Sequence, residues 1–119
     1  MAGHSIITYK GKEISYFDYR GMKMEEIIKT IEETSKKALR ENKRRLQLSN
    51  LTGVFAVPEF MNAVKEAGKN TKHLTSKSAV VGISGAKKLL LNIYNTFTGT
   101  DMKAFDDEES AKEWLIKDH

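Results

Sequence analysis

The chain has 119 residues, a length that suits one domain with one hydrophobic core and little volume to spare for a spacious cavity. Apolar residues make up 39% and charged residues 30%, the ordinary balance of a soluble globular protein. Cysteine is absent, which excludes disulfide frameworks, thiolate nucleophiles and thiolate metal sites. The formal net charge of +4 falls short of the concentrated basic face of a nucleic-acid binder.

Two kinds of sequence pattern bear on localisation, that of a membrane span and that of a secretory signal. No apolar run approaches the ~20 residues of a membrane span. Residues 1–5 carry neither the basic region nor the apolar region of a secretory signal. We therefore expect a cytoplasmic protein without stable membrane insertion, and a single domain over residues 1–119.

The first third of the chain has the pattern of a hairpin followed by a helix. Residues 5–9 and 13–19 are rich in β-forming side chains, and a short loop with Gly11 at its centre separates them. Both faces of the second run carry bulk, so it should lie inside a sheet with the first run at the edge. Apolar residues then recur every three or four positions over residues 24–39, which predicts an amphipathic helix.

The middle of the chain predicts a second strand–helix pair. Residues 45–51 alternate apolar and polar, as in a strand. A turn and a short apolar loop, residues 54–57, lead to Pro58, which suits the first position of a helix because its missing N–H would be unpaired there anyway. Residues 68–76 read as a polar connection after that helix.

A β-α-β unit is the most regular part of the sequence. Residues 79–83 form an apolar run rich in Val and Ile, which predicts a buried strand. A helix follows the turn at Ser84-Gly85 and ends at Gly99, and residues 102–105 predict the next strand, in parallel. Six apolar residues of this helix fall on one predicted face: Ala86, Leu89, Leu90, Ile93, Tyr94 and Phe97.

The last helix begins with Asp106 or Asp107 as its N-cap and acidic residues in its first turn. Ala111, Trp114 and Leu115 should face the core. The fold class is therefore α/β: a single-layer, mixed, mostly parallel five-stranded sheet with four helices, in the order β-β-α-β-α-β-α-β-α.

The C-terminal half resembles the SpoIIAA-like family of the STAS and CRAL-TRIO-like fold group. The segments that carry the resemblance are 78–85 (SAVVGISG), 87–94, 97–99 (FTG), 105–109 (FDDEE) and 111–115 (AKEWL). The resemblance implies the anti-sigma-factor-antagonist fold. It also implies one of two roles: a partner-switching regulator that binds another protein, or a domain that buries a lipid or other apolar ligand.

One departure from the partner-switching relatives concerns phosphorylation. Those relatives carry a phosphorylatable Ser at the start of the second helix, preceded by Asp-Ser. Here that place falls at residues 57–59 (VPE), without a hydroxyl. The nearest hydroxyls are those of Ser49 and Thr52. The departure argues against a phosphorylation switch, although the same surface can still bind a partner.

The turn at Ser84-Gly85 is one candidate for recognition. It follows a buried strand and opens a helix, with Lys87 close behind, and a helix N-terminus suits an anion. The segment lacks the GxxxxGK[ST] spacing of a P-loop. The simpler interpretation is that Ser84 caps the helix and that Gly82 allows helix and strand to approach closely.

A second turn ends the preceding parallel strand and should lie on the same rim of the sheet. The simpler interpretation is turn chemistry, with Asn50 bonding its own backbone and Gly53 at positive φ. Together the two turns and the following helix start define a candidate partner or anion rim, which consists of Asn50, Thr52, Gly53, Pro58, Ser84, Gly85 and Lys87.

Other polar features give weaker signals. Residues 36–45 (KKALRENKRR) hold six basic residues, but they end a helix, where cations are favourable, and lack aromatic interleaving, so a solvated helix end is the simpler interpretation. His4, His73 and His119 have no partner at metal-ligand spacing. We expect no metal, no cofactor and no catalytic residue.

The sequence therefore predicts a non-enzymatic STAS-type binding or regulatory domain that acts through protein–protein contacts. The alternative is a domain that holds a small apolar or lipid ligand between helices and sheet, favoured by the bulky loop at residues 54–57. We expect a monomer or weak homodimer and no nucleic-acid partner.

Overall fold

A computed structural model describes residues 3–117 of the chain. The described part folds in the predicted order of strands and helices, with one additional 3-10 turn. The elements are β1 (His4–Tyr9), β2 (Lys12–Asp18), α1 (Met24–Glu41), β3 (Arg45–Asn50), α2 (Pro58–Thr71), η1 (Lys72–Leu74), β4 (Thr75–Val81), α3 (Ala86–Thr98), β5 (Lys103–Phe105) and α4 (Glu108–Ile116).

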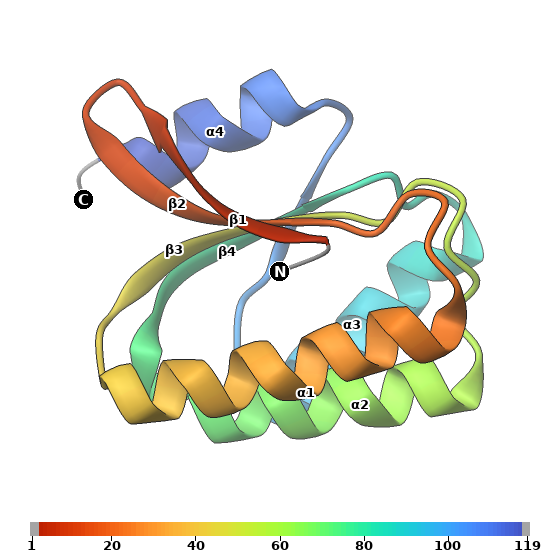
Figure 1. Ribbon diagram of the computed structural model, residues 1–119. Helices are drawn as coiled ribbons and strands as arrows, with labels where there is room; N and C mark the ends of the chain where they lie inside the picture. Colours follow the sequence, from red (N-terminus) through yellow and green to blue (C-terminus); the bar gives the residue numbers. More distant parts are fainter. Residues whose placement is uncertain (1–2, 118–119) are drawn as a thin grey trace.

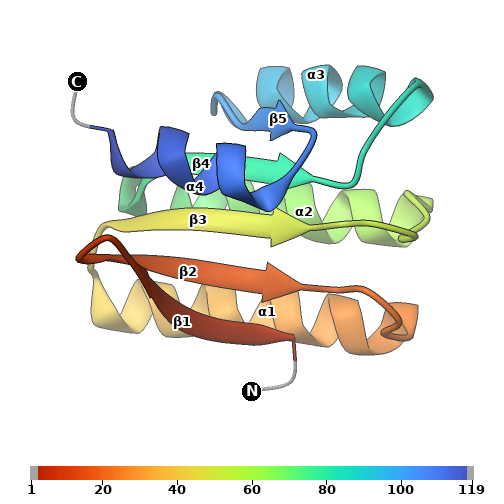
Figure 2. The same ribbon diagram turned by 90° about the horizontal axis from the view of Figure 1, so that it is seen from above.

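The five strands form one sheet in the order β1-β2-β3-β4-β5 (Figure 2). β1 pairs with β2 in the antiparallel sense, and the other pairs are parallel. The predicted mixed sheet, with the first strand at its edge, is confirmed. Lys10 and Gly11 join β1 to β2 with φ angles of 48° and 84°, the left-handed values that a two-residue hairpin turn requires.

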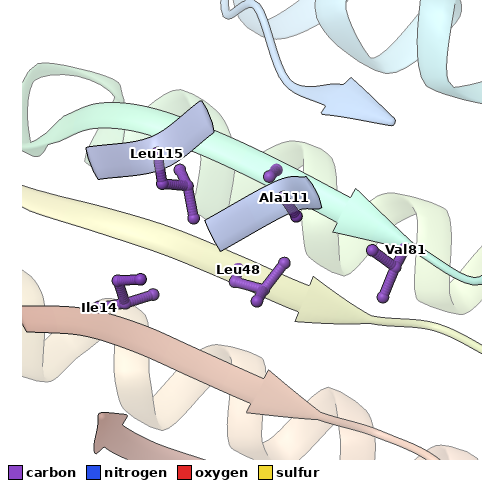
Figure 3. Close-up of a cluster of buried hydrophobic side chains, with 6 residues drawn as sticks. Ile14, Leu48, Val81, Ala111 and Leu115 are labelled. Atoms are coloured by element: carbon purple, nitrogen blue, oxygen red, sulfur yellow. The ribbon is translucent and has the colours of Figure 1, made fainter. Parts of the chain in front are cut away.

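Helices cover both faces of the sheet, as Figure 1 shows: α1, α2 and α3 lie on one face and α4 on the other. The α4 face carries a dense core, in which every buried side chain is at most 3% exposed (Figure 3). Its members are Ile14, Leu48, Ala79, Val81, Ala111 and Leu115. The predicted inward orientation of Ala111 and Leu115 is confirmed.

The opposite face of the sheet, beneath α1, α2 and α3, is more polar. Its buried apolar cluster consists of Phe17, Tyr19, Ile27, Ile31, Val54 and Phe60. Next to this cluster the sheet presents a polar row across three strands, because Ser15 pairs with Gln47 and Gln47 with Ser78. The Ser78 hydroxyl is buried and makes no hydrogen bond within the described residues.

The boundary between α2 and β4 differs from the prediction. The segment 68–76 is not a polar connection, since α2 continues to Thr71 and β4 already begins at Thr75. The reason is a close helix–helix contact. A Cβ on Gly68 would lie 2.3 Å from the Tyr94 Oη, so this glycine is a packing residue within α2 and does not end the helix.

The predicted inner face of α3 is correct only in part. Leu90 and Tyr94 line the space between this helix and the sheet, as predicted. Leu89, Ile93 and Phe97 are 63%, 45% and 56% exposed, so their predicted inward orientation is wrong. The helix carries apolar residues all round, so periodicity alone cannot tell which side is covered. None of the helices in residues 3–117 is both long and apolar enough to span a membrane.

Candidate functional site

The turns that follow β3 and β4 lie side by side at the carboxyl ends of the parallel strands. The Leu51 N–H donates to the Val81 carbonyl over 2.9 Å and extends the pairing beyond β3. A Cβ on Gly82 would lie 2.3 Å from the Thr52 Oγ1, so only glycine fits there, at a φ of 87°. The close approach that Gly82 permits is therefore between two turns, and not between a helix and a strand.

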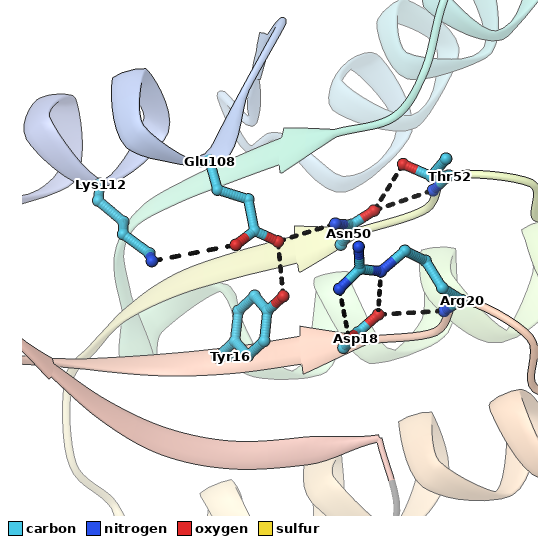
Figure 4. A network of polar contacts seen from close by, with 7 residues as sticks. All are labelled: Tyr16, Asp18, Arg20, Asn50, Thr52, Glu108 and Lys112. Carbon is cyan, nitrogen blue, oxygen red and sulfur yellow. Dashed lines mark hydrogen bonds and ion pairs between the residues drawn. The ribbon is translucent and has the colours of Figure 1, made fainter.

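Asn50 supports this rim from within. Its side chain is buried, and its Oδ1 accepts hydrogen bonds from the Thr52 N–H at 3.1 Å and the Thr52 Oγ1 at 2.7 Å (Figure 4). Its Nδ2 donates to Glu108 Oε2 over 2.8 Å. All the side-chain polar atoms of Asn50 are thus engaged within the protein, as the turn-chemistry interpretation requires.

Glu108 joins the first turn of α4 to the ends of two strands. Besides Asn50, its Oε2 accepts a hydrogen bond from the Tyr16 Oη at 2.5 Å, and Lys112 lies 3.9 Å from Oε1. Burial, together with this carboxylate, raises the pKa of Tyr16 to about 12. Sequence analysis missed this network, because nothing in the acidic run at residues 106–109 indicates which carboxylate turns toward the sheet.

An ion pair continues the polar surface beyond β2. The Arg20 guanidinium donates to both carboxylate oxygens of Asp18, each over 2.8 Å. These hydrogen bonds hold the pKa of Asp18 below its usual value. The pair is largely exposed, so it contributes at most about 1 kcal/mol to stability.

Ser84 does not cap α3. The N-cap residue is Gly85, and Ser84 meets the helix start through its backbone carbonyl, which accepts a hydrogen bond from the Lys87 N–H at 3.2 Å. The capping interpretation of Ser84 is therefore wrong, because the chain places glycine, with a φ of 56°, at the cap position. Ser84 and Thr52 both expose their side chains, whereas Ser49 is buried beneath the helices.

Large apolar side chains are exposed beside the rim. Phe55 and Val57, in the loop between β3 and α2, are 76% and 37% exposed, and Leu89 of α3 is 63% exposed. Pro58 follows as the first residue of α2, as predicted. Exposed apolar side chains of this kind often mark an interaction site.

A cavity of about 150 Å³ lies between the sheet and α1, α2 and α3. Apolar side chains form most of its wall, among them Phe17, Phe60, Leu90 and Leu91. The space is comparable to engineered cavities that admit a benzene ring. The short chain therefore leaves room for a small ligand, while a spacious cavity is absent from the described residues.

The basic segment 36–45 is less free than a solvated helix end. It borders a groove of about 400 Å³ at the amino ends of the strands. Arg44 donates to the Ser76 Oγ and to the His73 carbonyl, each over 3.2 Å, and Arg45 forms an ion pair with Glu41. Two of its cations are thus held in place.

Of the three histidines, the structure describes His4 and His73. His4 is half-buried, and its Nε2 lies 2.7 Å from the Ser15 Oγ. Burial first, then the charges of Lys37 and Arg45, lowers the pKa of His4 to about 4. His119 lies outside the described residues. Within residues 3–117 no three His, Asp or Glu side chains form a cluster that could hold a metal ion.

Comparisons with known proteins show the family of the chain. The sequence profile described as SpoIIAA-like matches residues 14–116, which is most of the chain. The chain belongs to the SpoIIAA-like family. A solved anti-sigma-factor antagonist (STAS) domain protein from Planctomyces limnophilus has the same fold as this SpoIIAA-like chain: 16% identity, a TM-score of 0.63, and coverage of 96% of this chain and 98% of the other. No curated protein matches the sequence.

Proposed function

We propose that the protein is a non-enzymatic binding and regulatory domain that acts through protein–protein contacts at the candidate rim. Membership of the SpoIIAA-like family, whose STAS relatives are commonly protein-interaction modules, supports this role. The observation that carries it is the exposure of Phe55 and Leu89, at 76% and 63%, beside two adjoining strand-end turns.

The rim contains exposed residues, which a partner could contact, and residues that are buried or half-buried. Thr52, Gly53, Pro58, Ser84 and Gly85 are exposed and available to a partner. Asn50 is buried and holds the first turn in shape, and the half-buried Lys87 also borders the cavity. We propose that this domain works in the cytoplasm as a monomer or weak homodimer, without a cofactor or metal.

Affinity capture from the native host tests the protein-binding role. The bait is the wild-type chain, compared with two double variants, Thr52→Ala/Ser84→Ala and Phe55→Ser/Leu89→Ser. Leu39→Ser is the matched control, because Leu39 is also an exposed apolar residue, at 43%, but lies near the other end of the strands on α1. We expect the double variants to lose a partner that the wild type and Leu39→Ser both retain. Equal recovery with all baits would exclude this rim.

The cavity favours a second candidate function, the binding of a small apolar or lipid ligand. Its volume of about 150 Å³ and its largely apolar wall fit a ligand of few carbon atoms. Native mass spectrometry of the purified protein should then show a bound small molecule, and fatty acids should raise the melting temperature. A clean ligand-free mass combined with no thermal shift would rule this function out.

A further inference from the structure

The sheet surface that faces the cavity changes from polar to apolar along the strand direction. On and after β3 the lining residues are, in order, Arg45, Gln47, Ser49 and Leu51. β2 repeats the change, with Ser15 before Tyr19. A wholly apolar ligand would offer no hydrogen bond to Gln47 and Ser49 in the polar half, and burying polar groups without new partners is costly. The gradient fits a ligand with an apolar end and a polar end.

The polar end of the cavity adjoins the basic groove at the amino ends of the strands. Ser15 and Arg45 line both spaces, so they form part of the boundary between them. The groove has four cationic residues against two carboxylates, which leaves an excess of two positive charges. They are Lys37, Lys43, Arg44 and Arg45, with Glu13 and Glu41.

Arg45 is the cation best placed to meet a ligand that extends from the cavity. Its side chain is only 16% exposed, and its ion pair with Glu41 fixes the guanidinium at the boundary. Arginine donates several hydrogen bonds from a planar fork that matches the geometry of a carboxylate. The pKa of the nearby His4 is lowered mainly by burial, and the charges of Lys37 and Arg45 lower it further.

We propose that the protein binds a short-chain anionic amphiphile, with its alkyl chain in the cavity and its carboxylate at Arg45. The inference rests on the second candidate function and specifies its ligand class. A cavity of about 150 Å³ accepts about six carbon atoms of an alkyl chain, by comparison with cavities that hold benzene. A diacyl lipid is too large for this space.

Calorimetric titration with three probes of equal chain length tests the charge of the head group. The probes are octanoate, octan-1-ol and octyltrimethylammonium. We expect octanoate to bind roughly tenfold more tightly than octan-1-ol, the gain typical of a charge-assisted hydrogen bond. The cationic probe should bind most weakly, because the groove repels it.

Two sets of variants locate the two ends of the ligand. Arg45→Gln should abolish the preference for octanoate over octan-1-ol, whereas Arg40→Gln should keep it. Arg40 belongs to the same basic segment but lines neither space, which makes it the matched control. Val64→Phe adds volume at the cavity wall and should weaken the binding of both octanoate and octan-1-ol. If Arg45→Gln does not fold, Lys37→Gln/Lys43→Gln replaces it and should reduce the preference.

The outcomes separate this proposal from the function on which it rests. Equal affinities for octanoate and octan-1-ol would overturn the anionic head group while leaving an apolar-ligand function intact. An octanoate affinity that Val64→Phe leaves unchanged would show that the anion binds in the groove alone, and it would also overturn the proposal. Absence of binding by all three probes would overturn both the proposal and the second candidate function.

Discussion

At the rim, the polar side chain of Asn50 has a structural role. The side-chain amide of Asn50 forms hydrogen bonds with Thr52 and Glu108, and the Glu108 carboxylate also accepts a hydrogen bond from the Tyr16 hydroxyl. These bonds tie the ends of β2 and β3 to the start of α4. A partner that binds the proposed rim would therefore meet Thr52 and Ser84, while Asn50 fixes the turn beneath them.

His4 makes stability depend on pH in one defined window. The folded state keeps this imidazole neutral down to pH of about 4, because burial and the charges of Lys37 and Arg45 lower its pKa from 6.5. The unfolded chain already takes up the proton near 6.5. As the pH falls between these two values the unfolded state binds more protons, so the free energy of unfolding decreases. Below about 4 both states are protonated and this loss ends.

Urea unfolding across that pH window measures the effect. We expect the free energy of unfolding of the wild type to fall more steeply with decreasing pH than that of His4→Gln. The glutamine variant keeps an amide that can bond to the Ser15 hydroxyl but cannot be protonated in this range. Parallel pH profiles for the two proteins would show that His4 does not cause the dependence.

Whole elements were predictable wherever a local signal marks them. Pro58 begins α2, Gly99 ends α3 in the left-handed conformation, and Asp107 caps α4 through a hydrogen bond from the Ser110 N–H at 2.7 Å. Gly68 is the residue at which the sequence analysis began a polar connection, although α2 continues to Thr71. Its real role depends on Tyr94, which comes from another helix, and sequence periodicity holds no information about such a contact.

Features that depend on several elements at once were less predictable. The two rim turns could be placed side by side from parallel pairing alone. The Glu108 network, the outward orientation of Leu89 and the cavity could not. Each depends on how far a helix stands from the sheet, which is set by side chains distant in sequence.

The contact between α2 and α3 can be tested at Gly68. In an open helix, Gly→Ala stabilises by about 1 kcal/mol. Here the added Cβ would lie 2.3 Å from Tyr94 Oη and 3.1 Å from Thr98 Cγ2, so we expect Gly68→Ala to destabilise by roughly 1–2 kcal/mol. Repeating the substitution in a Tyr94→Phe background should recover part of the loss, measured by urea unfolding. A gain in stability from Gly68→Ala alone would contradict the close contact.

The molecule as a whole has one tightly packed face and one face with a cavity. On the α4 side, six buried residues leave almost no exposed area. On the other side, a polar row and a partly open space adjoin the buried apolar cluster between the sheet and the helices. Both faces therefore supply apolar burial, but the three-helix face also contains an open space, which lowers its packing density.

Two leucine truncations compare these faces directly. Leu115 on α4 is 1% exposed, so Leu115→Ala should cost roughly 2–5 kcal/mol through lost burial and a new cavity. Leu91 on α3 is half-buried and already borders the existing cavity, so Leu91→Ala should cost only about 1 kcal/mol. Both free energies come from urea unfolding of otherwise identical proteins. Equal costs would mean that the three-helix face is as closely packed as the α4 face, and the space available for a ligand would then be lost.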